Sequence, residues 1–128
     1  AAAFFWSPVA GLNFAQAEEK NRVFEIRTYY ANEGKLDALL ARFRDHTVTL
    51  FKKHGMTNVG YWVPVDNKEN KLVYMLAFPS REARNKAFKA FSADPDWQKA
   101  RKESTKDGRL VKKIVNDFLA GTDFSKIK

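Results

Sequence analysis

The chain has 128 residues, 45% of them hydrophobic, and a formal net charge of +8 from 23 Lys and Arg against 15 Asp and Glu. This length fits one domain with a real hydrophobic core, and no second domain is needed. The absence of cysteine excludes disulfides and thiolate chemistry, and it agrees with either an oxidising or a reducing compartment. The positive charge favours acidic partners in general, but the basic residues alternate with acids and no recognition motif accompanies them, so no nucleic-acid partner is predicted.

Residues 1–17 carry no charge and end in the small-x-small sequence AQA. This pattern is typical of the rear part of a secretory signal peptide with cleavage after Ala17, and it predicts a periplasmic or secreted protein. The alternative is an N-terminal arm that packs on the domain. Pro8 and Gly11 argue against a membrane span, and no later stretch is apolar enough to provide one, so no transmembrane anchor is predicted.

The first half of the domain reads as a strand followed by a helix. Residues 22–31 alternate β-branched and aromatic residues with polar ones, which predicts a strand. Apolar residues then recur at helical spacing from Leu36 to His54, and Gly55 is a natural residue to end that helix. The two faces of the strand carry Phe24, Ile26, Thr28 and Tyr30 on one side and Glu25, Arg27 and Tyr29 on the other.

Two strands follow, at residues 57–65 and 71–79, separated by the polar segment DNKEN. Strands joined by so short a turn must be antiparallel.

The second half of the chain predicts two more helical segments and a last strand. Ser80 is placed to cap a helix over residues 81–91. Asp94, followed by a proline, is typical of the start of a further helical piece, which contains Trp97. Residues 109–120 then form the last strand.

This order, β-α-β-β-α-β, is the split βαβ arrangement of ferredoxin-like domains, an α+β fold with an antiparallel sheet. The helices cover one face of the sheet, and the other face is expected to carry Tyr29 with either Trp62 or Tyr61. That is much aromatic surface to leave in water. A second copy is the simplest cover, which predicts a homodimeric α+β barrel in which Glu25 and Arg27 meet across the interface.

Five segments of the domain carry a family resemblance through their order and spacing. They are FEIRTYYANEGKLDALLARFRDH, LFKKHGMTNVGYW, LVYMLAFPSREAR, DPDWQ and TDFS. Together, over residues 22–125, they resemble the NIPSNAP family. The resemblance implies a ferredoxin-like fold of the dimeric α+β-barrel type, usually homodimeric, with no generally established reaction. Related barrel families include cofactor-independent monooxygenases, haem-handling enzymes and stress-response proteins. The tail departs from the family pattern, because Ala120 and Gly121 stand where a proline is expected, so the resemblance supports docking of the tail less than it supports the rest of the fold.

The chain has two histidines, eight residues apart on the predicted helix. That spacing separates them by about 80° around the helix and about 12 Å along it, so they cannot bind one metal ion. No cysteine or zinc-type spacing is present, and no metal or cofactor is predicted. His54 lies at the helix end, where it would interact with terminal carbonyls. His46 lies at the border of the apolar stripe and is the candidate general base, the alternative being a hydrogen-bonded boundary residue.

The aromatic residues and one arginine are the candidate ligand-binding residues. Tyr29, Tyr61, Trp62 and Trp97 would line an apolar small-molecule pocket, unless they fill the core or an interface. Arg27 must be paired or bind an anion, and its neighbour on the same face, Glu25, favours a structural ion pair.

The sequence thus favours an exported, homodimeric protein that binds a small apolar or aromatic molecule. One alternative is a cofactor-independent monooxygenase or isomerase with His46 as base, and another is a protein-interaction module that uses the basic helices. A buried cavity touching His46 would favour the enzyme, a cavity lined by carbon would favour binding, and the lack of a cavity would favour interaction.

Overall fold

The computed structural model describes residues 22–128, so the predicted signal segment at residues 1–17 lies outside the described residues. Within the described part of the chain, no helix is long and apolar enough to span a membrane. The elements in chain order are β1 (Val23–Ala31), α2 (Leu36–Arg42), the π-helical turn η1 (Phe43–Thr47), α3 (Val48–Lys53), β2 (Thr57–Trp62), β3 (Lys71–Phe78), α4 (Arg81–Ala93), α5 (Pro95–Ser104) and β4 (Val111–Ala120).

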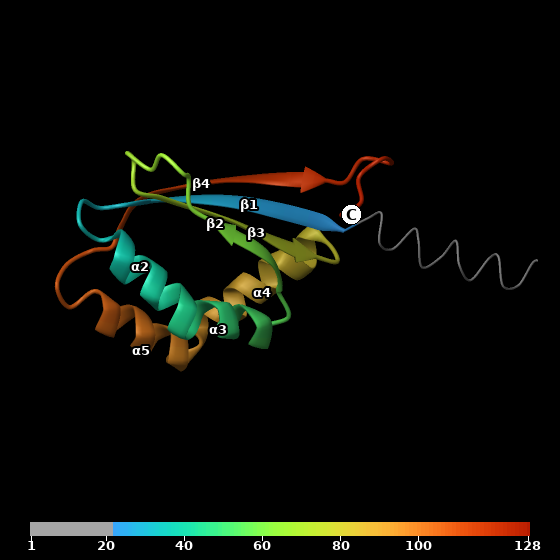
Figure 1. The fold of residues 1–128 in the computed structure, drawn as a ribbon. Helices are drawn as coiled ribbons and strands as arrows, with labels where there is room; N and C mark the ends of the chain where they lie inside the picture. The colour runs from blue at the N-terminus through green and yellow to red at the C-terminus, as the bar shows by residue number, and fades with distance from the viewer. Residues whose placement is uncertain (1–21) are drawn as a thin grey trace, which may run out of the picture.

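The four strands form one antiparallel sheet in the order β2-β3-β1-β4, and all the helices lie on one of its faces (Figure 1). The strand β1 is central and pairs with both β3 and β4. This is the ferredoxin-like α+β fold that the sequence predicts. The predicted second strand is shorter in the structure, because β2 ends at Trp62.

Local side-chain chemistry sets the ends of the helices as predicted. The Ser80 hydroxyl accepts a hydrogen bond from the Ala83 N–H at 3.0 Å, which caps α4. The Asp94 carboxylate accepts one from the Asp96 N–H at 2.9 Å and begins α5, with proline as the first helical residue. Gly55 has a φ of +81°, a conformation that favours glycine after a helix end.

The predicted first helix is interrupted by a π-helical turn that the sequence pattern did not show. In η1 the Val48 N–H donates to the Phe43 carbonyl, five residues back, and the Thr47 hydroxyl donates to the Arg42 carbonyl at 3.3 Å. Such a turn holds one residue more than an α-helical turn and is frequent at functional sites. Arg42, Phe43 and Thr47, which lie at this turn, are all buried.

The hydrophobic core lies between the helices and the sheet and is largely aromatic. Tyr61 stacks on Tyr74 with ring centroids 5.1 Å apart, and the centroids of Phe51 and Phe91 lie 4.8 Å apart. Aromatic pairs at these separations contribute beyond their buried area. The buried cluster contains Tyr29, Ala31, Leu39, Phe43, Leu50, Phe51, Met56, Leu72, Tyr74, Leu76, Phe78, Phe91 and Leu110.

The predicted assignment of the two faces of β1 was wrong. Glu25, Arg27 and Tyr29 face the helices, where Glu25 accepts hydrogen bonds from Arg84 of α4 and Tyr29 joins the core. Charged residues are tolerated there because they are paired and hydrogen-bonded. The other face instead carries Phe24, which is buried, together with Ile26, Thr28 and Tyr30, and Ile26 and Thr28 are in register with Met75 and Val73 of β3.

The two aromatic residues at the end of β2 lie on opposite faces. Tyr61 lies on the helix side against Tyr74, whereas Trp62 lies on the open face opposite Val73 and is 54% exposed. Of the aromatic residues predicted for the open face, only Trp62 is therefore found there.

Candidate functional site

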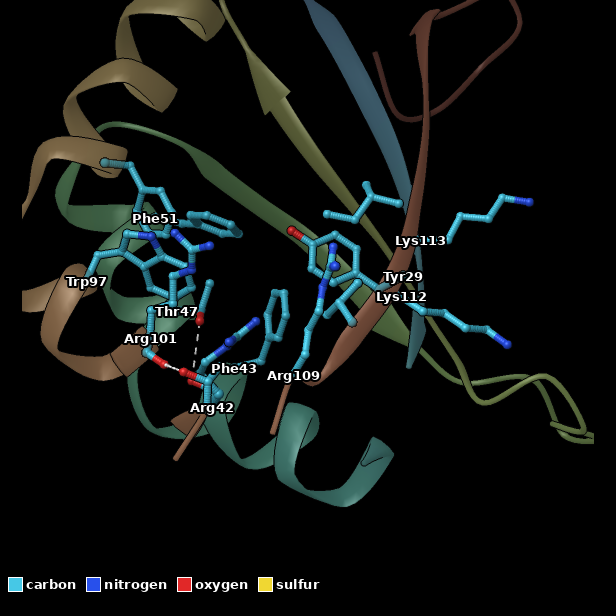
Figure 2. Close-up of a pocket in the computed structure, with 14 residues that line it drawn as sticks. Tyr29, Arg42, Phe43, Thr47, Phe51, Trp97, Arg101, Arg109, Lys112 and Lys113 are labelled. Atoms are coloured by element: carbon cyan, nitrogen blue, oxygen red, sulfur yellow. Dashed lines mark hydrogen bonds between the residues drawn. The ribbon is translucent and has the colours of Figure 1, made fainter. Parts of the chain in front are cut away.

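A partly open cavity of about 410 Å³ lies between the helical layer and the β1–β4 side of the sheet (Figure 2). Ligand pockets in proteins have volumes of roughly 300–1,000 Å³, so it is large enough for a small molecule. The lining residues come from β1, from α2 to α3, from α4 and α5, and from the start of β4 with the segment before it. They are Tyr29, Arg42, Phe43, Thr47, Phe51, Phe91, Trp97, Arg101, Thr105, Arg109, Val111, Lys112, Lys113 and Ile114.

Aromatic rings form much of the cavity wall. Tyr29 meets Phe43 edge to face with ring centroids 5.6 Å apart, and Phe91 packs against Trp97 at 4.6 Å. These rings also belong to the core or pack against it, so their positions are fixed by the fold. The wall is therefore a preformed apolar surface.

Arg42 is the most unusual residue of the cavity. It is 8% exposed, its Nη1 donates to the Ser104 hydroxyl at 3.3 Å, and its guanidinium carbon lies 5.2 Å from the centre of the Trp97 ring. Its Nε is buried without a hydrogen-bond partner among the described residues. Burial lowers the pKa of Arg42, and the nearby charge of Arg101 lowers it further.

Other cations accompany Arg42, and none of the lining residues is acidic. Arg101 comes from α5 and Arg109 from the segment before β4. Figure 2 shows the side chains of Lys112 and Lys113 extending away from the other labelled residues, so the arginines supply the cations that face the cavity. The electrostatic balance of the cavity is strongly positive.

The hydroxyl of Tyr29 has an unused donor. It accepts hydrogen bonds from the Tyr74 hydroxyl at 3.1 Å and from Nη2 of Arg27 at 3.2 Å. With the Tyr74 hydroxyl as the donor of this pair, the single hydrogen of the Tyr29 phenol has no further acceptor within residues 22–128. Tyr29 can therefore donate to a molecule in the cavity.

Behind Tyr29, the carboxylate of Glu25 organises a buried polar network. Glu25 is fully buried and accepts hydrogen bonds from Arg84 at 2.8 and 2.9 Å, from Arg27 at 2.7 Å and from Asn116 at 2.9 Å. Burial alone would raise its pKa, but the hydrogen bonds from Arg84, Asn116 and Arg27 together lower the pKa of Glu25. The network holds Tyr29 in place through Arg27.

Arg27 belongs to this network and does not line the cavity. It pairs with Glu25, and its Nε donates to the Tyr74 hydroxyl at 2.7 Å. The structural ion pair that the sequence favours is therefore present, but within one chain and beneath the helices. The expectation that Glu25 and Arg27 meet across a dimer interface was wrong, since both lie on the helix-covered face.

His54 has a hydrogen-bonding partner that the sequence did not indicate. Its Nε2 lies 2.7 Å from the Asp94 carboxylate, which also accepts a hydrogen bond from Lys53 at 2.8 Å. The hydrogen bonds from Lys53, His54 and the Asp96 N–H lower the pKa of Asp94. His54 thus ties the end of α3 to the start of α5.

His46 lies outside the cavity. It is exposed and lines a separate groove against α5, together with Asp45, Asp96, Lys99 and Glu103. No cluster of three or more His, Asp and Glu residues that could hold a metal ion occurs in the described part of the chain. The catalytic role of His46 stays a prediction.

Two of the five predicted ligand-binding residues, Tyr29 and Trp97, line the cavity. The other three lie in the buried network, in the core and on the open face, as described above. Sequence reasoning missed Arg42, Arg101 and Arg109. Only Arg42 gave a signal, because it stands beside Phe43 on the helix stripe, where an arginine more often extends its charge to solvent.

Comparisons with known proteins agree with this fold. The sequence profile of the NIPSNAP family matches residues 24–126. A NIPSNAP family protein with unknown function from Agrobacterium tumefaciens has a crystal structure that superposes with a TM-score of 0.75 at 27% identity, covering 85% of this chain and 96% of that chain. An uncharacterised NIPSNAP-like domain protein from Burkholderia xenovorans gives 0.72 at 18% identity, with 83% and 90% covered.

A more distant likeness extends to another group that shares only the fold. A candidate antibiotic biosynthesis monooxygenase from Nitrosomonas europaea superposes with a TM-score of 0.59 at 12% identity, covering 83% of this chain and 95% of that chain. No curated protein matches the chain. The family profile covers most of the described residues, and the chain belongs to the NIPSNAP family.

Proposed function

We propose that this protein binds a small molecule with an apolar or aromatic body in the cavity between its helices and its sheet. The observation that carries the proposal is the partly open volume of about 410 Å³ with walls of preformed aromatic rings. When a ligand covers an apolar surface that is left open in this way, the free energy of the system falls, which favours binding. Binding is favoured over catalysis because the candidate base, His46, lines a different groove.

A neutral probe, 1-naphthamide, tests the proposal by isothermal titration calorimetry. We expect saturable binding to the wild-type chain and its loss in Val111→Trp, because the larger side chain fills the cavity that Val111 lines. Val65→Trp is the matched control, since Val65 is fully exposed. Absence of binding by the wild type, or equal binding by both variants, would contradict the proposal.

We also propose that the open face of the sheet is covered by a second copy of the chain. Ile26, Val73 and Met75 lie side by side on this face, and Val115 and Leu119 of β4 are 46% and 39% exposed. Asp117, opposite Ile26, interrupts this apolar surface on β4, but exposed apolar surface on several neighbouring strands still marks an interaction site. Light scattering should give twice the monomer mass, and Val115→Glu should give the monomer while Val65→Glu does not.

Export is a separate proposal that rests on the uncharged segment ending in AQA. Intact-mass measurement on protein from the source cell should show a chain that begins at Glu18. Recovery of the uncleaved chain alone would refute export.

A further inference from the structure

We propose that the ligand of this cavity carries a carboxylate, and that Arg42 is the residue that binds it. This inference rests on the binding function proposed above and adds the chemical class of the ligand. It starts from the state of Arg42, which is 8% exposed and has no acidic partner among residues 22–128.

A buried charge is costly unless it is paired and hydrogen-bonded. The Trp97 ring and one hydrogen bond of 3.3 Å to Ser104 compensate Arg42 only in part. Neither Nε nor Nη2 donates to any residue that the structure describes. Nε is enclosed by protein atoms, whereas Nη2 is not, so Nη2 is the free donor that a ligand can reach. Arg42 therefore brings an unused donor and an unneutralised charge to the cavity, and charged hydrogen bonds of this kind commonly bind carboxylates.

The surroundings favour an anion and oppose a cation. Arg101 and Arg109 add positive charge, and no acid lines the cavity. Tyr29 contributes a free hydroxyl hydrogen, which suits an oxygen acceptor. The remaining wall is mainly aromatic carbon, which suits an apolar body. A molecule with one carboxylate head and an aromatic or aliphatic body satisfies both parts.

A matched pair of probes tests the charge separately from the shape. Naphthalene-1-carboxylate and its neutral amide, 1-naphthamide, differ mainly in the head group. We expect the carboxylate to bind the wild-type chain at least about tenfold more tightly, because hydrogen bonds to charged groups are the stronger ones. Isothermal titration calorimetry at a fixed ionic strength gives both dissociation constants.

Arg42→Met removes the charge and keeps the length of the side chain. In this variant the tenfold preference should disappear while 1-naphthamide still binds, which also shows that the variant is folded. Arg44→Met is the control, since Arg44 is exposed two residues along the chain and does not line the cavity, and its preference should equal that of the wild type.

The outcomes separate the two proposals. If neither probe binds the wild type, the binding function itself fails and this inference fails with it. If both probes bind equally, the cavity binds small molecules but the carboxylate inference is overturned. If the preference survives in Arg42→Met, Arg42 is not the carboxylate-binding residue, and the inference is again overturned. Loss of the preference in Arg42→Met alone supports it.

Discussion

Two arginines of this chain are largely withdrawn from solvent, and their surroundings are opposite. The Arg27 side chain is 11% exposed and meets Glu25, Tyr74 and Tyr29 with hydrogen bonds of 2.7 to 3.2 Å. Arg42 is 8% exposed, and within residues 22–128 its guanidinium meets the Ser104 hydroxyl and the face of Trp97 but no acid. A paired buried cation supports the fold, whereas an unpaired one at a cavity indicates a place for a ligand.

The first test of this comparison removes the carboxylate of Glu25, which pairs with Arg27. Glu25→Ala leaves the largely buried Arg27 and the partly buried Arg84 without their shared counter-charge, so we expect the free energy of unfolding to fall by about 3–5 kcal/mol. Urea denaturation measures this loss. Glu82→Ala is the control, because Glu82 makes only an exposed pair with Lys86, and its effect should stay within roughly 0.5 kcal/mol. A small effect of Glu25→Ala would mean that the network does not stabilise the fold.

The second test replaces each arginine by methionine. Arg27→Met should lower the free energy of unfolding by about 3 kcal/mol, because it leaves Glu25 short of a partner. Arg42→Met should leave it unchanged or raise it by about 1 kcal/mol, because an uncompensated charge is replaced by an apolar side chain against Trp97. Urea denaturation of both variants gives the comparison. Equal losses in the free energy of unfolding would show that Arg42 stabilises the fold as much as Arg27 does.

The third test is the dependence of stability on pH. The pKa of Glu25 and that of Asp94 are lowered in the folded state, so the stability they contribute is complete above the unfolded carboxyl range and is lost as the pH falls through the folded values. Urea midpoints at pH 7, 5, 4 and 3 should fall in the wild type and fall less steeply in Glu25→Gln. The effect of Arg42→Met on the free energy of unfolding should be the same at pH 7 and pH 4, since Arg42 has no carboxylate partner in the described part of the chain. A stability that rises toward pH 3 would contradict the prediction that stability falls as these carboxylates are protonated.

The smallest effects are expected at the two histidines. His54→Ala should lower the free energy of unfolding by about 1 kcal/mol, because it removes the contact with Asp94 that joins two helices. His46→Ala should change it by less than roughly 0.5 kcal/mol, because His46 is exposed. If His46→Ala were the more damaging, the assignment of these two residues would be reversed.

Most of the fold could be predicted from the sequence because its signals are local. Period-two alternation marks β1, and Ser80, Asp94 and Gly55 mark helix ends that the structure confirms. The orientation of β1 could not be predicted in this way. Alternation shows that two faces differ, but which face meets the helices depends on partners such as Arg84 and Asn116, far away in the chain.

The candidate site was predicted only in part, because it is assembled from distant segments. Tyr29 and Trp97 were identified as candidate ligand-binding aromatics, and both line the cavity. The arginines were missed because a basic residue on a helix is usually solvated, and only the packing shows that Arg42 has no partner. The position of His46 was inferred from an ideal helix of 3.6 residues per turn, whereas the chain contains a π-helical turn at that point.

The π-helical turn η1 also affects which side chains of the helix reach the cavity. One residue corresponds to about 100° of rotation around a helix, and η1 holds one residue more than the turn it replaces. Compared with an uninterrupted α-helix, the segment after Thr47 is therefore turned about the helix axis relative to the segment before Phe43. One additional residue in a helix is thus enough to change which of its side chains face the sheet.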